Sequence, residues 1–224
     1  MSYRTAKRMV MVFLHGGASH IDTFDPKDDP DTGGEFKSIK TSVSGLRLAE
    51  HLPGLAERMN SLALIRSMTS KEGNHSRARY LMHTGFVPQG GVVHPAWGSV
   101  ISSKRESRPL PNYVAINGPG HGAGYLGAAH SAFTVRKASK PVANLAPPRA
   151  VSADRRDRRL EMWRALETSD ASQSVQREGQ RAVTEQGISL IGSRDVAAFD
   201  LEQESRATRA RYGEDDFGLG CLMA

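Results

Sequence analysis

Side chains that bind divalent metal ions follow the first apolar run of the chain, Val10–Leu14. They are His15, His20, Asp22 and Asp25. Imidazole nitrogens and carboxylate oxygens are common metal ligands, so His15, His20 and Asp22 are candidate ligands. The alternative is that the two aspartates form turns before Pro26 and that His15 packs beneath the loop. The spacing supports both interpretations equally.

A second group of candidate residues lies where a helix is expected to begin, over about residues 75–83. The group consists of His75, Ser76, Arg77 and Arg79. A helix N-terminus presents unpaired N–H groups and the positive end of the helix dipole, which stabilise a phosphate, a sulfate or an anionic nucleophile. The two arginines follow closely enough to neutralise an oxyanion. The plainer alternative, which the isolated sequence favours, is that Asn74 or Ser76 caps the helix and both arginines are solvated.

The third candidate is a glycine-rich loop, Asn117–Gly127, which follows an expected strand at Asn112–Ile116. Glycines after a strand can cradle a phosphate, and His121 in this loop is a candidate substrate-binding residue. No strong helix pattern follows, so a dinucleotide-binding fingerprint is not expected. A flexible surface loop is an equal alternative. The histidines at positions 51, 83 and 94 show no paired spacing and are predicted to be structural.

The chain of 224 residues is long enough for one large globular domain or two small ones, with 38% hydrophobic and 24% charged residues. Residues 1–148 hold 18 Lys and Arg against 10 Asp and Glu, whereas residues 149–224 hold 12 against 14. A basic front half suits an anionic small substrate or an anionic polymer, although scattered solvated charges are an alternative. Aromatic residues make up only 6% and do not alternate with a basic stripe, so nucleic acid is not an expected partner.

Cysteine content and hydropathy exclude several classes of protein. The single cysteine, Cys221, excludes an intrachain disulfide and a cysteine-based zinc knuckle. No apolar run is long enough to span a membrane, and Met9–Leu14 is too short for the core of a signal peptide. We therefore expect no membrane span and no export signal in these residues, and the localisation stays open.

The elements that must position the candidate residues alternate between strand and helix, as in a parallel α/β sheet. Buried strands are expected at Val10–Leu14, Ser61–Arg66 and Asn112–Ile116, with an edge strand at Ser131–Val135. Helices are expected at Leu48–Met59, 75–83, Pro95–Glu106 and Arg155–Leu166, with further helical sequence to Arg211. In open α/β folds, ligands bind at the carboxyl ends of the strands, which is where the first and third candidate groups lie.

Four blocks of the sequence resemble one known family. They read HGGASHIDTFDPK, LAEHLPGLAERMNSLALIRSMTS, NHSRARYLMHTGFVP and GPGHGAGYLGAAHSAF, in this order from about Arg8 onward. They resemble the domain of unknown function 1501 family, bacterial proteins often found in planctomycetes and placed with the alkaline phosphatase and sulfatase superfamily. The resemblance implies a mostly parallel, alkaline-phosphatase-like sheet flanked by helices. Residues 1–148 would be its N-terminal part, and residues 149–224 a helix-rich segment of the same domain.

The resemblance also implies an activity, which is hydrolysis of sulfate or phosphate esters at a divalent metal ion such as Zn²⁺, Ca²⁺ or Mg²⁺. The implied partner is a small anionic ester or a sulfated or phosphorylated glycan. His75 and Ser76 stand near the nucleophile position of sulfatases, because Thr84-Gly85 resembles the block that ends the helix after that nucleophile. Under this resemblance Arg77, Arg79 and His121 would bind the substrate, and His15, His20 and Asp22 the metal.

The sequence departs from the superfamily pattern in two places. The superfamily has a metal-binding aspartate at the end of its first strand, where this chain has His15-Gly16. Neither His75 nor Ser76 is the cysteine that sulfatases convert to formylglycine. The superfamily also takes Asp and His ligands from its C-terminal half, and Phe217–Ala224 has the pattern of an apolar helix that is just beginning.

We therefore expect the N-terminal portion of a metal-dependent hydrolase, inactive as a fragment. The alternative is a non-catalytic relative that binds an anionic glycan. Relatives often carry export signals for the periplasm or the extracellular space.

Overall fold

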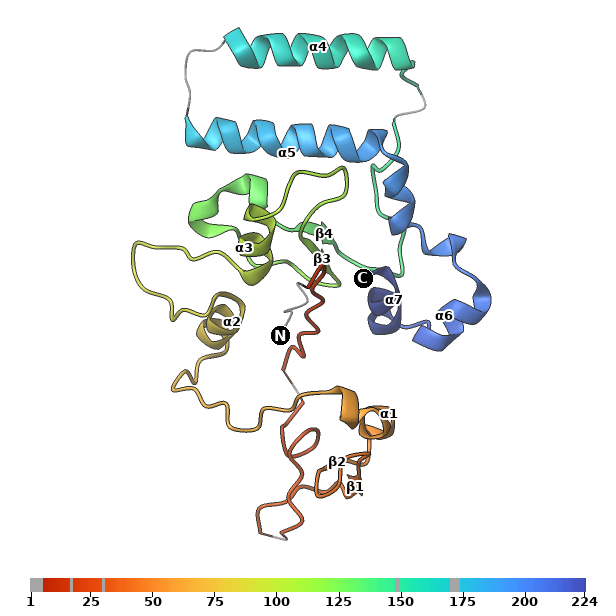
Figure 1. The fold of residues 1–224 in the computed structure, drawn as a ribbon. Coiled ribbons are helices and arrows are strands. Elements are labelled where there is room, and N and C mark those ends of the chain that lie inside the picture. Colours follow the sequence, from red (N-terminus) through yellow and green to blue (C-terminus); the bar gives the residue numbers. More distant parts are fainter. Residues whose placement is uncertain (1–5, 17, 30, 148–149, 170–173) are drawn as a thin grey trace, which may run out of the picture. The chain divides into compact units, whose positions relative to one another are not determined.

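The structure, a computed structural model, describes residues 6–16, 18–29, 31–147, 150–169 and 174–224 (Figure 1). The chain divides into two compact units, Met1–Lys71 (unit 1) and Glu72–Ala224 (unit 2). The change of composition after residue 148 therefore lies inside unit 2. Both units combine helices with short strands, which confirms the mixed α/β class. The described strands form two sheets of two strands each rather than one large parallel sheet.

Unit 1 is built on a short antiparallel hairpin followed by helical turns. Its elements are β1 (Ser38–Lys40), β2 (Arg47–Ala49), the α-helix α1 (Pro53–Glu57) and the 3₁₀-helix η1 (Met59–Ser61). Ile39 of β1 lies opposite Leu48 of β2. Leu48 is fully buried and packs with Ala56 and Met59 to form the core of this unit.

The prediction of a single helix at Leu48–Met59 is wrong for the first half of that range. Only Pro53–Glu57 is α-helical. Proline has no N–H to donate and disfavours the helical conformation in the residue before it, so the helix begins at Pro53. Leu48 instead belongs to β2, from which its side chain packs against Ala56 of α1 and Met59 of η1.

Two predicted strands do not form in the described part of unit 1. Val10–Leu14 and Ser61–Arg66 carry no strand pairing, and the side chains of Val10 and Ile65 are 64% and 68% exposed. A β-strand exists only where a neighbouring strand accepts and donates its backbone hydrogen bonds. Apolar, β-favouring sequence is therefore not sufficient to make these two segments strands.

Unit 2 begins with two helices and a parallel pair of strands. These are α2 (His75–Thr84), α3 (Trp97–Ser103), β3 (Val114–Ile116), η2 (Gly124–Leu126), η3 (Ala128–His130) and β4 (Phe133–Val135). Val114 of β3 lies opposite Phe133 of β4. The strands predicted at these positions are confirmed, as are the helices at 75–83 and Pro95–Glu106, the latter in a shorter form.

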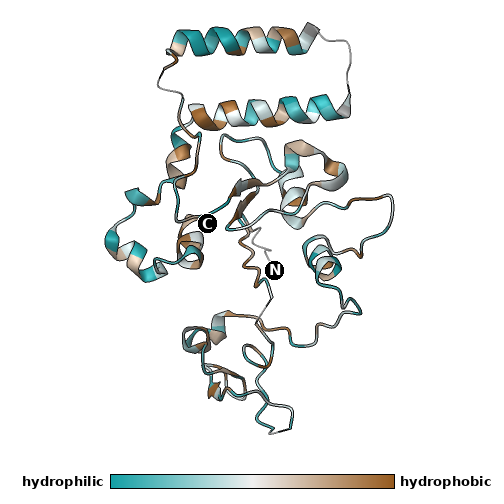
Figure 2. Cartoon of the chain, turned by 180° about the vertical axis from the view of Figure 1, so that it is seen from behind, coloured by the Kyte–Doolittle hydropathy of each residue, from teal (hydrophilic) through white to brown (hydrophobic). Residues whose placement is uncertain are grey.

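The C-terminal part of unit 2 is helical. Its elements are α4 (Ala153–Ser169), α5 (Val175–Gly192), η4 (Arg194–Phe199), η5 (Leu201–Gln203), α6 (Arg206–Tyr212) and α7 (Asp216–Met223). Figure 2 shows β3 and β4 in the hydrophobic colour and much of α4 in the hydrophilic colour. Val135, Leu190 and Phe199 form the buried core that joins the strand pair to α5 and η4.

Candidate functional site

In unit 1, the acidic loop is organised around Asp25. Lys27 Nζ lies 2.8 Å and His20 Nδ1 3.4 Å from Asp25 Oδ2. Arg66 Nε lies 3.5 Å from Asp25 Oδ1. The hydrogen bond from Lys27, helped by the charges of Lys27 and Arg66, holds the pKa of Asp25 below its usual range, although partial burial opposes this. Asp25 therefore acts as the anionic centre of a structural ion cluster.

The candidate metal ligands of the same loop do not meet. His15 and His20 are exposed, and Asp22 is half-buried with its Oδ1 close to Gly34. Within the residues that the structure describes, no three His, Cys, Asp or Glu side chains form a group that could hold a metal ion. The positive side chains of Lys27 and Arg66 around Asp25 also repel a cation. The described loop does not fit a divalent ion as it stands, and the metal role of His15, His20 and Asp22 stays a prediction.

In unit 2, the N-terminus of α2 is capped by the chain itself. The side-chain oxygen of Asn74 accepts hydrogen bonds from the backbone N–H of Ser76 at 3.0 Å and of Arg77 at 3.2 Å. Arg77 Nε donates to Glu72 Oε2 at 2.8 Å. Two of the N–H groups that an anion would use are thus already occupied, and Arg77 is paired with a carboxylate. This agrees with the interpretation of Asn74 as the helix cap.

One face of α2 carries three of the four candidate residues of this helix. At about 100° per residue, an arc of about 100° holds four side chains. They are His75, Ser76, Arg79 and His83, which we call the α2 face. His75 and Ser76 are exposed, whereas Arg79 and His83 are half-buried. Arg77 falls outside this arc, on the side where it pairs with Glu72.

The glycine-rich loop brings His121 onto the α2 face. The imidazole rings of His83 and His121 stack with their centroids 3.9 Å apart and their planes 23° from parallel. Burial, and secondly the charge of Arg79, lower the pKa of His121. The structure therefore places His121 against His83 and within electrostatic reach of Arg79, so two predicted substrate-binding residues lie in the same region of unit 2. It adds His83, which the sequence analysis treated as structural.

The loop that carries His121 is anchored along its length. Ala96 N–H donates to the Gly122 carbonyl and Tyr125 N–H to the Val93 carbonyl, both at 3.1 Å. Gly124 has φ +53°, and a Cβ there would lie 2.2 Å from the Val93 oxygen. Only glycine fits this contact. These contacts favour a fixed loop over the alternative of a flexible surface loop.

His94 is held in a fixed orientation beside the same loop. The Tyr80 hydroxyl lies 2.9 Å from His94 Nδ1 and accepts the backbone N–H of His94 at 2.7 Å. Phe86 stacks on the imidazole, with centroids 4.1 Å apart. This agrees with the prediction that His94 is structural. Arg79 and His83 are four residues apart, so the sequence alone could have placed them on one helix face. The sequence offered no signal that His121 approaches this face.

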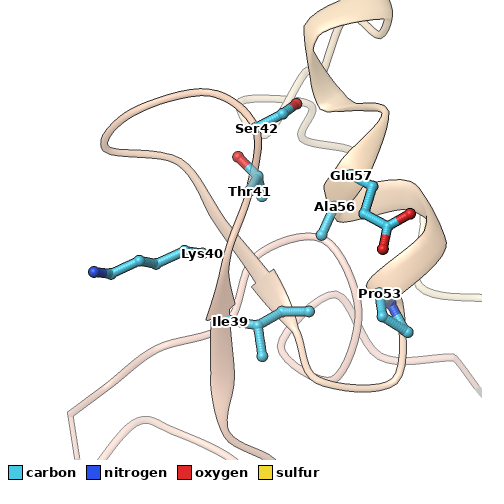
Figure 3. Close-up of a pocket in the computed structure, with 7 residues that line it drawn as sticks. All are labelled: Ile39, Lys40, Thr41, Ser42, Pro53, Ala56 and Glu57. Atoms are coloured by element: carbon cyan, nitrogen blue, oxygen red, sulfur yellow. The ribbon is translucent and has the colours of Figure 1, made fainter.

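The two hollows described in unit 1 are not lined by the candidate residues. The first, of about 470 Å³, is shown in Figure 3 and is lined by Ile39, Lys40, Thr41, Ser42, Pro53, Ala56 and Glu57. The second, of about 410 Å³, is lined by residues of 27–38 and by Arg47. Neither contains a predicted catalytic, substrate-binding or metal-binding residue.

Comparison with known proteins supports the resemblance at the level of the family. The family described as "Protein of unknown function (DUF1501)" matches residues 6–224, which covers both units and all the candidate residues. The chain belongs to the DUF1501 family. No curated protein and no solved structure matches this DUF1501 chain. In its described part, none of the helices is long and apolar enough to cross a membrane.

Proposed function

We propose that this DUF1501 protein belongs to a group of alkaline-phosphatase- and sulfatase-like hydrolases, and that unit 2 binds the anionic group of a phosphate or sulfate ester. The observation that carries the proposal is the convergence of Arg79, His83 and His121. A guanidinium offers several N–H donors in a fixed fork, and imidazole nitrogens can donate alongside it. Such a set of donors matches the oxygens of a phosphate or sulfate group.

The positions of the predicted catalytic residues support the proposal. His75 and Ser76 lie on the α2 face, so a group bound at Arg79 would be within one helical turn of both. The lowered pKa of His121 favours its neutral form at neutral pH, in which the imidazole can both donate a hydrogen bond and accept a proton. The parallel pairing of β3 with β4 supports an alkaline-phosphatase-like sheet as the wider fold of the family.

A second candidate function is non-catalytic binding of an anionic glycan by the same residues. Two observations favour it. In the described part of the chain, no base is hydrogen-bonded to the Ser76 hydroxyl, and the candidate metal ligands of unit 1 do not cluster. A nucleophilic serine requires a base, a metal or a lowered pKa for its activation. Binding of the glycan, without hydrolysis, would then be the function of the protein.

The deciding experiment measures hydrolysis of an aryl phosphate and an aryl sulfate by the full-length gene product, with and without added Zn²⁺, Ca²⁺ or Mg²⁺. Arg79→Gln and His75→Ala are compared with Arg108→Gln, which changes an exposed arginine outside α2. We expect both test variants to lose at least about tenfold in kcat/KM, which corresponds to about 1.4 kcal/mol, while Arg108→Gln keeps full activity. Unchanged turnover in Arg79→Gln would contradict the proposal. A folded protein that binds phosphate but hydrolyses neither ester would support the second candidate.

A further inference from the structure

Helix α4 of unit 2 has one half-buried face, which turns toward α5. Its half-buried side chains repeat at intervals of four and three residues, as in a seam between two helices. They are Arg156, Leu160, Trp163 and Glu167. Next to this seam, Arg164 joins the two helices, because its Nε and Nη2 donate to the two carboxylate oxygens of Glu185 at 2.8 and 2.9 Å. The two helices lie side by side in Figure 1.

A second face of α4 is exposed and repeats at the same intervals. At about 100° per residue, an arc of about 100° holds five exposed side chains, which we call the α4 face. They are Arg155, Arg158, Arg159, Met162 and Leu166. Met162 is 61% and Leu166 65% exposed. Positions 155, 159, 162 and 166 are spaced as in the seam toward α5, so the α4 face has the geometry to receive another helix.

The three arginines of the α4 face have no salt-bridge partner among the side chains that the structure describes. The salt bridges described for α4 join Arg156 to Asp157 at 3.1 Å and Arg164 to Glu185 at 2.8 Å. The three arginines also lie near the positive end of the helix dipole, where a positive charge is unfavourable. Residues that break a local rule of stability are expected where a protein binds a partner.

We infer that the α4 face is a docking surface for an acidic amphipathic helix of a partner protein. The arginines complement carboxylates, because a guanidinium donates two parallel N–H groups to one carboxylate. The pairing of Arg164 with Glu185 is a contact of this kind within unit 2. Apolar side chains of the partner would cover Met162 and Leu166. Methionine and arginine are both enriched in protein interfaces relative to other surfaces.

Three other occupants fit the α4 face less well. Nucleic acid would pair with the arginines, but its phosphate backbone would leave Met162 and Leu166 uncovered. A lipid surface is flat and wide, and Asp154 and Glu161, within about 60° of Arg158 around the helix, would approach its anionic headgroups. Antiparallel pairing of two copies about Met162 would place Arg158 opposite Leu166 and not opposite a carboxylate. A separate acidic helix therefore fits best.

The experiment measures binding of a synthetic peptide to the full-length protein by calorimetry. The peptide is a helix three heptads long, with Leu at the seam positions of one half and Glu at those of the other. A second peptide has Gln for each Glu, and a third has Lys. The test variant is Arg158→Glu with Arg159→Glu. Its control is Arg206→Glu, which reverses an exposed arginine of α6.

We expect the acidic peptide to bind the parent protein and the Gln peptide to bind at least about tenfold more weakly, because the charge pairs are lost. The double variant should lose at least about tenfold in affinity for the acidic peptide and gain affinity for the Lys peptide. A purely structural role of the two arginines would not produce that gain. Arg206→Glu should bind the acidic peptide like the parent. Met162→Ser should weaken it in every charge background.

Four outcomes would overturn the inference. They are no saturable binding of the acidic peptide, equal affinity for the acidic and Gln peptides, and equal affinity of the parent and the double variant for the acidic peptide. The fourth is tighter binding to vesicles of phosphatidylserine and phosphatidylcholine than to the peptide, which would assign the face to a lipid surface. Phosphate binding and ester hydrolysis should be unchanged in the double variant, since its two residues lie outside the α2 face and the His121 loop.

Discussion

Arg66 lies 3.5 Å from Asp25 and connects three parts of unit 1. Its guanidinium also donates to the carbonyl oxygen of Phe24 at 2.9 Å and to that of Arg47 at 2.6 Å. One side chain thus ties the acidic loop and the end of the hairpin to the segment at 61–66. The apolar residues of that segment form no strand and so gain no strand hydrogen bonds. The polar contacts of Arg66 therefore help to fix the position of the segment.

The Asp25 ion cluster gives a prediction on stability and pH. Asp25→Asn removes the negative charge that Lys27, Arg66 and His20 surround, and we expect a loss of about 1 kcal/mol in the free energy of unfolding at pH 7. The pKa of Asp25 is lowered in the folded state, so its contribution is fully present above the ordinary value of about 3.9. It is lost as the pH falls through the lowered folded value.

Urea unfolding of the parent protein and Asp25→Asn should therefore differ at pH 7 and converge in acid. The control is Glu57→Gln, whose carboxylate is exposed and only loosely paired at 3.9 Å with Arg58. A constant difference at every pH would show that Asp25 does not act through its charge.

His121 gives a prediction on its own titration. Burial and the charge of Arg79 lower its pKa, so Arg79→Gln should raise that pKa while leaving it below the ordinary value of about 6.5, because burial is the larger cause. The neutral imidazole stabilises the fold above pH 6.5, and this contribution is lost as the pH falls through the lowered value. An NMR titration of the His121 ring protons measures the shift. Arg77→Gln is the control, since Arg77 pairs with Glu72, and an equal rise in that variant would contradict the assignment.

The cap of α2 can be tested by changing Asn74. Asn74→Ala leaves the N–H groups of Ser76 and Arg77 without their acceptor and should cost about 1 kcal/mol of stability. Asn74→Asp keeps an acceptor and places a negative charge at the positive end of the helix, so it should be at least as stable as the parent. Thermal unfolding distinguishes the two. Equal loss in both variants would mean that the amide group, and not the acceptor, is required.

Gly124 tests the anchoring of the loop that carries His121. Gly124→Ala combines a positive φ with a Cβ placed against the Val93 carbonyl, so we expect a loss of about 2 kcal/mol or more. Gly122→Ala is the matched control, because no atom lies within 4 Å of a Cβ at that position. Phosphate binding should also weaken in Gly124→Ala, since His121 is displaced from His83. Unchanged unfolding in both variants would show that the loop adapts freely.

Local signals predicted several short elements of unit 2 correctly. Helix α2 follows from Asn74, whose side chain caps it, and from Gly85, which ends it with φ +78°. The strands β3 and β4 follow from short β-favouring runs next to glycines and polar turns. The placement of Arg79 and His83 on one helix face could also be read directly, because helix geometry depends only on residue spacing.

Tertiary structure decided the rest. Val10–Leu14 is as β-favouring as Val114–Ile116, yet only the second segment is a strand, because only it has a partner, β4, to complete its backbone hydrogen bonds. Likewise, the sequence contains His121 and His83 but does not predict that their rings stack beside Arg79. Their approach depends on the contact of Gly124 with Val93 and on the stacking of two imidazoles from distant segments, and such contacts arise only when the chain has folded.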